Sequence, residues 1–209
     1  MNFGLIADGN RRWARGQGLS PKDGHRKGFT TVTDVIYPLL LKNTHFNSMT
    51  VYAFSTENWK RSVTEVNYLM KLYKEMLDSW LPDLLKKNVR IVHAGRKDRI
   101  PKFLRKKIEE VEAVSRDHDA FTVYLCLDYG GRDEIERAAK KGNITENLEV
   151  PELDLVMRTG GENRLSNFCV WQAAYAEFFF VKKCLPEIKK ADVEKIIANF
   201  LERNITKGK

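Results

Sequence analysis

The sequence is poor in cysteine and contains no long apolar run. Its 209 residues include three cysteines, Cys126, Cys169 and Cys184, and none of them forms a CxxC pair. We therefore predict buried free thiols, typical of a reducing compartment, in place of disulfides or a zinc site. No stretch approaches the roughly 18 uncharged apolar residues of a membrane span, and no basic leader opens the chain. The expected protein is soluble and cytoplasmic.

Several catalytic signatures are also missing. The chain has no GxxxxGK[ST], no GxGxxG after its first apolar segment, no GxSxG and no HExxH. These absences argue against P-loop nucleotide binding, dinucleotide binding, serine hydrolysis and zincin chemistry. The formal net charge of +8 fits nucleic acid, an anionic membrane surface or an anionic small substrate. No RNP-like or zinc-finger pattern accompanies the charge, which disfavours nucleic acid.

Apolar, β-rich segments alternate along the chain with segments of helical period. Strands that are apolar on both faces and alternate with helices indicate a parallel sheet that is covered on both sides. We predict one α/β domain over residues 1–209, with a central, mostly parallel six-stranded sheet flanked by helices. The predicted strands are 2–7, 49–55, 89–95, 121–130, 153–161 and 177–181, and the predicted helices are 31–41, 64–85, 101–115 and 191–203.

Glycine, arginine and acidic residues follow four of the predicted strands. In an open α/β sheet, ligands bind beyond the carboxyl ends of the strands. Arginine presents a planar fork that matches phosphate oxygens, and glycine lets backbone amides approach them. This edge of the sheet is therefore expected to bind a phosphorylated ligand. The four polar segments are 8–12, 55–61, 128–132 and 158–164.

Asp8 stands out among these residues because a lone carboxylate repels phosphate. The conflict disappears if Asp8 holds Mg²⁺, which proteins bind through one or two carboxylates together with substrate phosphates. The run that contains Arg11 and Arg12 would also open a helix, whose first amides and dipole favour anions. A metal on Asp8 and a diphosphate on the arginines is the functional interpretation.

Each of these residues also has an ordinary structural explanation. Asp8 fits a helix N-cap, Gly9 fits a turn, and any one arginine fits a solvated or salt-bridged position. His25 fits a cap or a surface position, and both "GGR" and "TGG" occur in ordinary turns. The functional interpretation therefore depends on the coincidence of these residues at one edge of one predicted sheet.

Five blocks, in order along the chain, resemble those of the cis-prenyltransferases. The resemblance implies that family's parallel-sheet fold, a homodimer, and Mg²⁺-dependent condensation of isopentenyl diphosphate onto an allylic diphosphate such as farnesyl or geranylgeranyl diphosphate. The product would be a Z-polyprenyl diphosphate, a lipid carrier precursor. The blocks are "DGNRRWA" at 8–14, "GHRKG" at 24–28, "AFSTENWKR" at 53–61, "YGGRDEI" at 129–135 and "DLVMRTGGENRLSNFCVWQAAYAEFFF" at 154–180.

The resemblance also implies a role for each matching residue. Asp8 and Asn58 would be catalytic, with Asn58 helping proton removal, and Asp8 and Glu177 would bind the metal. Arg158, Arg164 and Ser166 would bind isopentenyl diphosphate. The growing hydrocarbon needs an apolar tunnel, which the sheet interior and the helical segment 66–77 are candidates to line. The allylic diphosphate would lie on Gly9, Asn10, Arg11, Arg12, Trp13, His25 and Arg61.

The chain departs from the family pattern in several places. Pro21 replaces an arginine, with Lys22 beside it as a candidate substitute, and Asn163 replaces a histidine. The family's final arginine-glycine tail is not recognisable in residues 201–209. Two other functions stay open: a non-catalytic homologue that serves as a partner subunit, and a basic domain that binds nucleic acid. The favoured interpretation has no nucleic-acid partner and at most peripheral membrane contact.

Overall fold

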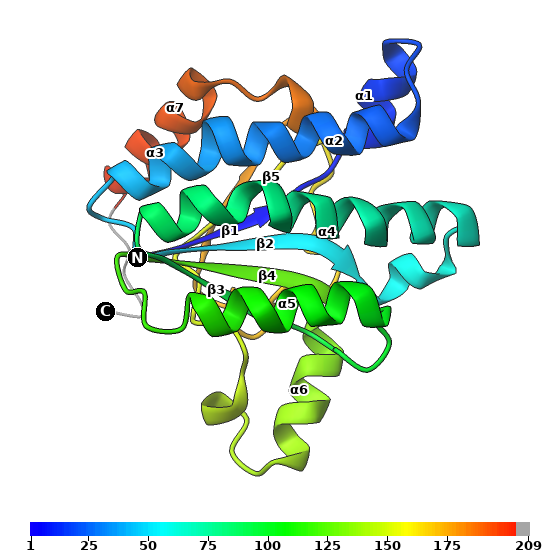
Figure 1. The fold of residues 1–209 in the computed structure, drawn as a ribbon. Helices are drawn as coiled ribbons and strands as arrows, with labels where there is room; N and C mark the ends of the chain where they lie inside the picture. Colours follow the sequence, from blue (N-terminus) through cyan, green and yellow to red (C-terminus); the bar gives the residue numbers. More distant parts are fainter. Residues whose placement is uncertain (204–209) are drawn as a thin grey trace.

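The computed structural model describes residues 1–203 and shows one six-stranded sheet with the order β3-β4-β2-β1-β5-β6 (Figure 1). Every strand pair is parallel, so the predicted mostly parallel sheet is confirmed and is wholly parallel. The carboxyl ends of all strands consequently lie at one edge. The strands are β1 (Asn2–Ile6), β2 (Ser48–Ser55), β3 (Val89–Ala94), β4 (Phe121–Tyr129), β5 (Leu155–Arg158) and β6 (Glu177–Phe180).

The helices are more numerous than the sequence pattern predicted, and most of them cover one face of the sheet (Figure 1). The larger core lies on this face and joins residues of the sheet to residues of the α2–α3, α4, α5 and α7 helices. The helices are α1 (Asn10–Gly16), α2 (Pro21–Thr31), α3 (Tyr37–Lys42), α4 (Val63–Lys86), α5 (Lys102–Val114), α6 (Gly131–Lys140) and α7 (Lys190–Leu201). Short turns are η1 (Val32–Ile36), η2 (Thr56–Lys60), η3 (Thr145–Asn147) and η4 (Leu185–Glu187).

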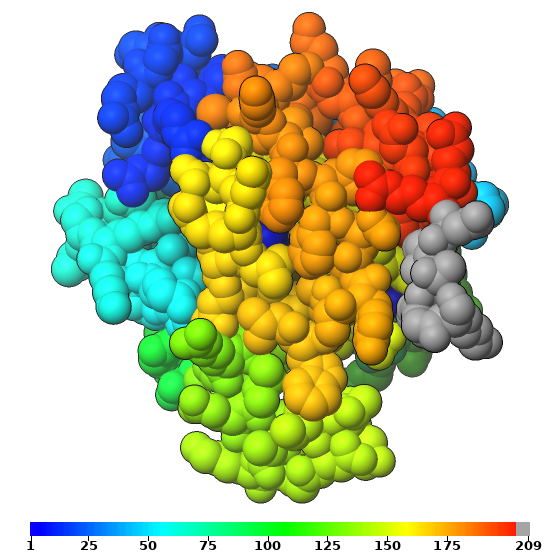
Figure 2. Space-filling model, turned by 180° about the vertical axis from the view of Figure 1, so that it is seen from behind, coloured from blue at the N-terminus to red at the C-terminus, as the bar shows by residue number. Residues whose placement is uncertain are grey.

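The second face of the sheet is covered mainly by irregular chain and not by helices. A smaller core there includes Tyr52, Cys126 and Phe168. Figure 2 shows this face, with the yellow-to-orange segment that follows α6 spread over its centre. Cys126, Cys169 and Cys184 are buried and free, as predicted. None of the helices in residues 1–203 combines the length and apolarity that crossing a bilayer requires.

The helical segment before β2 begins ten residues earlier than predicted. Ser20 caps α2 through a reciprocal capping box with Asp23, and Pro21 occupies the first turn, where a missing N–H has no cost. The helix then continues through the π-helical turn η1 into α3. The capping signal "SPKD" was present in the sequence, but the polar residues of α2 hide its helical period.

Two glycines of the "GHRKG" block let α1 pack directly on α2. A Cβ atom on Gly24 would lie 2.2 Å from the carbonyl oxygen of Asn10, and one on Gly28 would lie 2.2 Å from its side-chain oxygen. Because the two glycines are four residues apart, they lie on the same face of α2. This close approach fixes the position of the segment that follows β1.

We expect Gly24→Ala to lower the free energy of unfolding by about 1–3 kcal/mol, the usual cost of overpacking. The backbone of Asn10 must move to admit the methyl group. Gly16→Ala is the matched control, since a Cβ atom there meets nothing within 4 Å. Thermal unfolding measures both variants. Equal melting temperatures for Gly24→Ala and Gly16→Ala would contradict the tight α1–α2 contact.

Candidate active site

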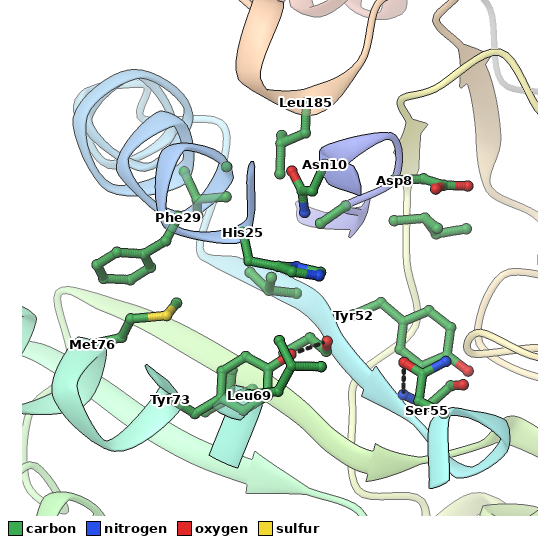
Figure 3. Close-up of a pocket in the computed structure, with 18 of the residues that line it drawn as sticks. Asp8, Asn10, His25, Phe29, Tyr52, Ser55, Leu69, Tyr73, Met76 and Leu185 are labelled. Atoms are coloured by element: carbon green, nitrogen blue, oxygen red, sulfur yellow. Dashed lines mark hydrogen bonds between the residues drawn. The ribbon is translucent and has the colours of Figure 1, made fainter. Parts of the chain in front are cut away.

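A cavity of about 400 Å³ opens between the sheet and the helices α2 and α4 at the carboxyl ends of β1, β2 and β5. Its lining is polar at one end and apolar along the rest (Figure 3). The polar residues are Asp8, Asn10, His25, Ser55, Asn58, Arg61, Arg158, Arg164 and Ser166. The helix α4 supplies Leu69, Leu72, Tyr73, Met76, Leu77 and Trp80, so the prediction that segment 66–77 lines an apolar cavity is confirmed.

Asp8 and Arg158 form the centre of the polar end. Nη2 of Arg158 donates to Oδ2 of Asp8 over 2.8 Å, and Nη1 donates to Oγ of Ser166 over 2.8 Å. The same Nη1 also donates to the carbonyl oxygen of Arg164. Arg158 is 3% exposed, and its Nε has no hydrogen-bond partner. One buried guanidinium therefore joins the segment after β1 to the segment after β5.

The backbone around Asp8 is held by the turn that follows β5. Oγ1 of Thr159 accepts a hydrogen bond from the Asp8 N–H over 3.0 Å and donates to the Asp8 carbonyl oxygen over 2.7 Å. Gly160, with φ of +87°, lies so close that a Cβ atom would sit 3.1 Å from the Asp8 carbonyl carbon. The positive φ and this short approach explain the first glycine of "TGG".

The arginines at the rim of the cavity are paired with two glutamates. Glu65 lies 3.1 Å from Arg61 and 3.4 Å from Arg11. The Arg11 side chain is 50% exposed and the Arg61 side chain is 28% exposed, so both keep a surface open to solvent. Glu65 therefore orients both arginines, and their guanidinium groups remain available to an anionic ligand.

Glu162 makes the corresponding contacts on the other side of the site. One of its oxygens lies 2.6 Å from Nη1 of Arg164 and the other lies 3.7 Å from Nη2 of Arg12. Arg12 also donates to the carbonyl oxygen of Gly160. The residues of the "DGNRR" and "TGGENR" blocks therefore meet in space, as expected for segments at the carboxyl ends of parallel strands.

His25 lies on α2 with its imidazole directed into the cavity (Figure 3). Its Nε2 atom is buried without a hydrogen-bond partner. Burial, followed by the positive charges of Arg61 and Arg11, lowers the pKa of His25 to about 4, against an opposing effect of Glu65. The side chain is therefore neutral at pH 7, so it adds a polar group to the site without adding charge.

Asn58 belongs to η2 and is fixed by the backbone of β2. Its Oδ1 atom accepts a hydrogen bond from the Ser55 N–H over 3.2 Å. Because this oxygen is engaged, the amide nitrogen is the part of the side chain left to contact a ligand. An amide is also a very weak base, so this geometry favours an orienting contact over direct proton removal.

Not every residue singled out in the sequence lines the cavity. Gly9 caps the first turn of α1, and Arg11, Arg12 and Trp13 lie in that short helix, beside the polar end but outside the cavity lining. The rest of the predicted set lines the cavity, apart from Glu177. Lys22 stacks over the ring of Tyr68, 4.9 Å from its centre, and does not line the cavity in place of the arginine that Pro21 replaces.

Glu177 is not close to Asp8 in this chain. It is the first residue of β6 and pairs with Leu155 at the start of β5, whereas Asp8 follows the carboxyl end of β1. In a parallel sheet the first residues of the strands and the residues that follow the strands lie at opposite ends of the sheet. Glu177 instead forms an ion pair with Arg203. One chain therefore does not unite the two carboxylates that the resemblance assigned to one metal.

The segment at the carboxyl end of β4 also departs from the expectation of a shared polar edge. Residues 128–132 do not line the cavity. A Cβ atom on Gly130 would lie 2.7 Å from the Asn167 side chain, and one on Gly131 would lie 2.8 Å from Val170. These glycines permit close packing of the chain, so "GGR" does not form a phosphate-binding loop here.

The donors around Asp8 fit a magnesium ion that substrate helps to hold. No group of three or more histidine, cysteine, aspartate or glutamate side chains within residues 1–203 is arranged to bind a metal. Mg²⁺ does not need one, since it is commonly bound by one or two carboxylates and substrate phosphates. The carboxylate of Asp8 is about one-third exposed and lines the cavity.

Sequence reasoning missed Glu65 and Glu162, which pair with the arginines, and the aromatic residues at the apolar end. The glutamates carried no signal beyond their position near the motifs. Phe29 and Trp80 were not singled out, because apolar residues in helices line a cavity wall or fill the core with the same spacing. The departure at Asn163 lies beside Glu162, and most of the tail at 201–209 lies outside the described residues.

The fold and the site define an α/β protein whose anion-binding residues stand at the mouth of an apolar cavity. The profile of the family described as "Putative undecaprenyl diphosphate synthase" matches residues 6–208. An isoprenyl transferase of Campylobacter jejuni is 37% identical over all of this chain and 98% of its own length. An isoprenyl transferase of Helicobacter pylori is 38% identical over 97% of this chain and 94% of its own length.

Two solved structures have the same fold. Lavandulyl diphosphate synthase from Lavandula x intermedia, in complex with dimethylallyl diphosphate, superposes with a TM-score of 0.93 at 28% identity over all of this chain and 98% of its own. A probable undecaprenyl diphosphate synthase from Campylobacter jejuni superposes with a TM-score of 0.86 at 33% identity and the same coverage. This chain belongs to the cis-prenyltransferase family and is a prenyltransferase.

Proposed function

We propose that this enzyme condenses isopentenyl diphosphate with an allylic diphosphate to give a Z-polyprenyl diphosphate, a lipid carrier precursor. The observation that carries the proposal is the buried Arg158, which bonds Asp8 on one side and Ser166 on the other at the head of an apolar cavity. In the proposed complex, the anion-binding residues on the two sides of Arg158 hold two diphosphates side by side. The apolar cavity then accepts the hydrocarbon of the allylic substrate.

The residues on the two sides of Arg158 bind different substrates in this proposal. The amides of residues 9–12, with Arg12, Arg61 and His25, bind the allylic diphosphate in this proposal. Arg164 and Ser166, with Arg158, bind isopentenyl diphosphate. Fixing both diphosphates holds the allylic carbon against the alkene, which removes much of the entropic cost of the bimolecular step.

Asp8 holds Mg²⁺ in the proposed complex. The ion supplies positive charge to the leaving allylic diphosphate. Arg12 and Arg61 add further charge stabilisation to the departing group. Asn58 and neutral His25 orient the reacting groups, and the apolar wall of Leu69 and its neighbours excludes water from the allylic cation.

The proposal extends to assembly and location. β6 is an edge strand of the sheet, and the large apolar side chains of Trp171, Tyr175 and Phe180 are 43%, 66% and 41% exposed. An exposed edge with an apolar surface favours association with a second copy. We therefore include a homodimer in the proposal. A cytoplasmic location with at most peripheral membrane contact is a further part of it.

Single-arginine variants test the division into two substrate sites. We expect Arg164→Ala to raise KM for isopentenyl diphosphate about tenfold or more, and Arg12→Ala to raise KM for the allylic diphosphate similarly, because each loses charged hydrogen bonds. The other substrate's KM should change little in each case. Arg15→Ala removes the same charge from the exposed end of α1 and is the control. If each variant raised both KM values equally, the division would be wrong.

A further inference from the structure

Asp128 is a buried carboxylate that the proposed chemistry does not use. It is 0% exposed, and it adopts a φ of +54° although it is not glycine. It also stands at an irregularity in the sheet. The pairing of β2 with β4 advances from Phe54 and Leu127 to Ser55 and Tyr129, which leaves Asp128 without a partner on β2. Bulges of this kind redirect side chains next to active sites.

The redirected carboxylate binds two side chains from different loops. The indole Nε1 of Trp59 donates to it over 2.7 Å, and Nε of Arg99 donates over 2.8 Å. Nη2 of Arg99 donates to it as well, so the guanidinium and the carboxylate form a two-point pair. Arg99 comes from the loop after β3 and neutralises a charge that is otherwise fully buried.

Trp59 connects this pair to the active site. It lies in η2, a short turn that contains no buried residue. Its ring packs edge-on against Phe54, with ring centres 5.1 Å apart. Its sequence neighbour Asn58 and the residue that ends the turn, Arg61, both line the polar end of the cavity. The indole N–H is therefore a further anchor of this turn, in addition to the hydrogen bond between Asn58 and the Ser55 N–H.

We infer that Asp128, paired with Arg99, is a positioning residue that acts through the indole N–H of Trp59 to hold Asn58 and Arg61 at the diphosphate end of the cavity. This inference rests on the proposed function. Neither Asp128 nor Arg99 lines the cavity, so neither contacts substrate. Their effect is on where the η2 turn lies, and it should be felt by the allylic diphosphate more than by isopentenyl diphosphate.

Trp59→Phe isolates the hydrogen bond because it keeps a ring against Phe54 and removes the N–H. We expect KM for the allylic diphosphate to rise about tenfold, since small misplacements of positioning groups have effects of this order. KM for isopentenyl diphosphate should stay within about twofold. A purely structural residue would lower the melting temperature and leave this KM ratio unchanged, and that result would overturn the inference.

Arg99 offers a rescue test. Arg99→Ala leaves the Asp128 carboxylate without its counter-ion and should raise the allylic KM. Asp128→Asn keeps an oxygen that accepts from Trp59, needs no counter-ion, and tolerates a positive φ. Adding Asp128→Asn to Arg99→Ala should therefore restore the allylic KM to within about twofold of the wild type. Failure of the double variant to recover would contradict the mechanism.

Arg96→Ala is the matched control for charge and location. Arg96 lies in the same loop, and its side chain pairs with Asp98 and not with Asp128. Its backbone N–H bonds the Asp128 carbonyl oxygen over 3.0 Å, and this bond survives the substitution. The allylic KM of Arg96→Ala should match the wild type. A rise equal to that of Arg99→Ala would show a general effect of charge and overturn the inference.

Hydrogen exchange separates this inference from the proposed function. The Arg61 N–H bonds the Asn58 carbonyl oxygen over 3.0 Å, so its exchange reports the order of the turn without any substrate. We expect a peptide that covers residues 56–61 to exchange faster in Trp59→Phe than in the wild type. Unchanged exchange would overturn the positioning role. A wild type that makes no prenyl product would overturn the proposed function alone.

Discussion

Asp8→Asn is expected to lower kcat by about 10²- to 10³-fold, the usual effect of removing one group that stabilises transition-state charge. Arg158 and the Gly9 N–H donate to different oxygens of Asp8. The amide keeps one of these two acceptors and nearly the same shape, so the fold should survive. What it loses is the negative charge that holds Mg²⁺ against the leaving diphosphate. Steady-state turnover at saturating substrates measures the effect, together with the melting temperature.

The control for Asp8→Asn is Asp34→Asn, which removes a carboxylate from an exposed position in η1. Its kcat should equal that of the wild type. We also expect Asp8→Ala to abolish turnover in a folded protein. If Asp8→Ala or Asp8→Asn turned over at the wild-type rate, the assignment of Asp8 as the metal ligand would be wrong.

Trp80→Leu is expected to lengthen the product. Trp80 is the last residue of α4 that lines the cavity, and α4 runs from the polar end toward the opposite edge of the sheet. At 1.5 Å per residue, the distance along the helix from Val63 to Trp80 is about 25 Å. The indole therefore lies at the deep end, where a growing hydrocarbon would stop.

An aromatic cluster closes this end of the cavity. The Trp80 ring packs edge-on against Tyr37, with ring centres 5.0 Å apart, and against Phe29 at 6.0 Å. Its Nε1 atom is buried without a hydrogen-bond partner. Replacing the indole by a smaller apolar group opens space without leaving a polar atom unsatisfied, so chain growth should continue by whole isoprene units before it meets a wall.

Chromatography of the extracted products against polyprenyl standards measures the change. Leucine is preferred to alanine because it keeps more of the packing of this partly buried side chain. Truncating a fully buried tryptophan to alanine costs about 3–5 kcal/mol. Trp171→Leu, on the exposed surface near β6, should leave the product length unchanged. An unaltered product distribution in a folded Trp80→Leu enzyme would contradict the assignment of Trp80 as the end of the cavity.

The sequence predicted the sheet and most of the site because both depend on local patterns. Apolar runs located all six strands, and the rule that parallel strands present ligands at their carboxyl ends brought Asp8 together with Arg158. The predictions failed where the answer depends on the exact register of the chain. Glu177 follows a motif that reads as part of the site, but it opens its strand, so it lies at the far edge.

The prediction also failed for Asp128, although this residue lies at the correct end of its strand. It lies near the carboxyl end of a predicted strand, close to two glycines and an arginine, so the pattern placed it in the site. A bulge in β4 turns its side chain away toward Trp59 and Arg99. Nothing in the local sequence announces a bulge of this kind, since its geometry depends on how β2 and β4 align over their whole length.

The central claim is that two diphosphates bind side by side at the head of one apolar cavity. Asp8 holds the metal, Arg12 and Arg61 bind one diphosphate, and Arg158 and Arg164 bind the other. Incubating the purified protein with farnesyl diphosphate, labelled isopentenyl diphosphate and Mg²⁺ tests it most directly, with a magnesium-free control. The account predicts a labelled polyprenyl diphosphate of defined length that forms only with Mg²⁺. No product from a folded protein, with shorter and longer allylic starters also tried, would contradict the claim and favour a non-catalytic partner subunit.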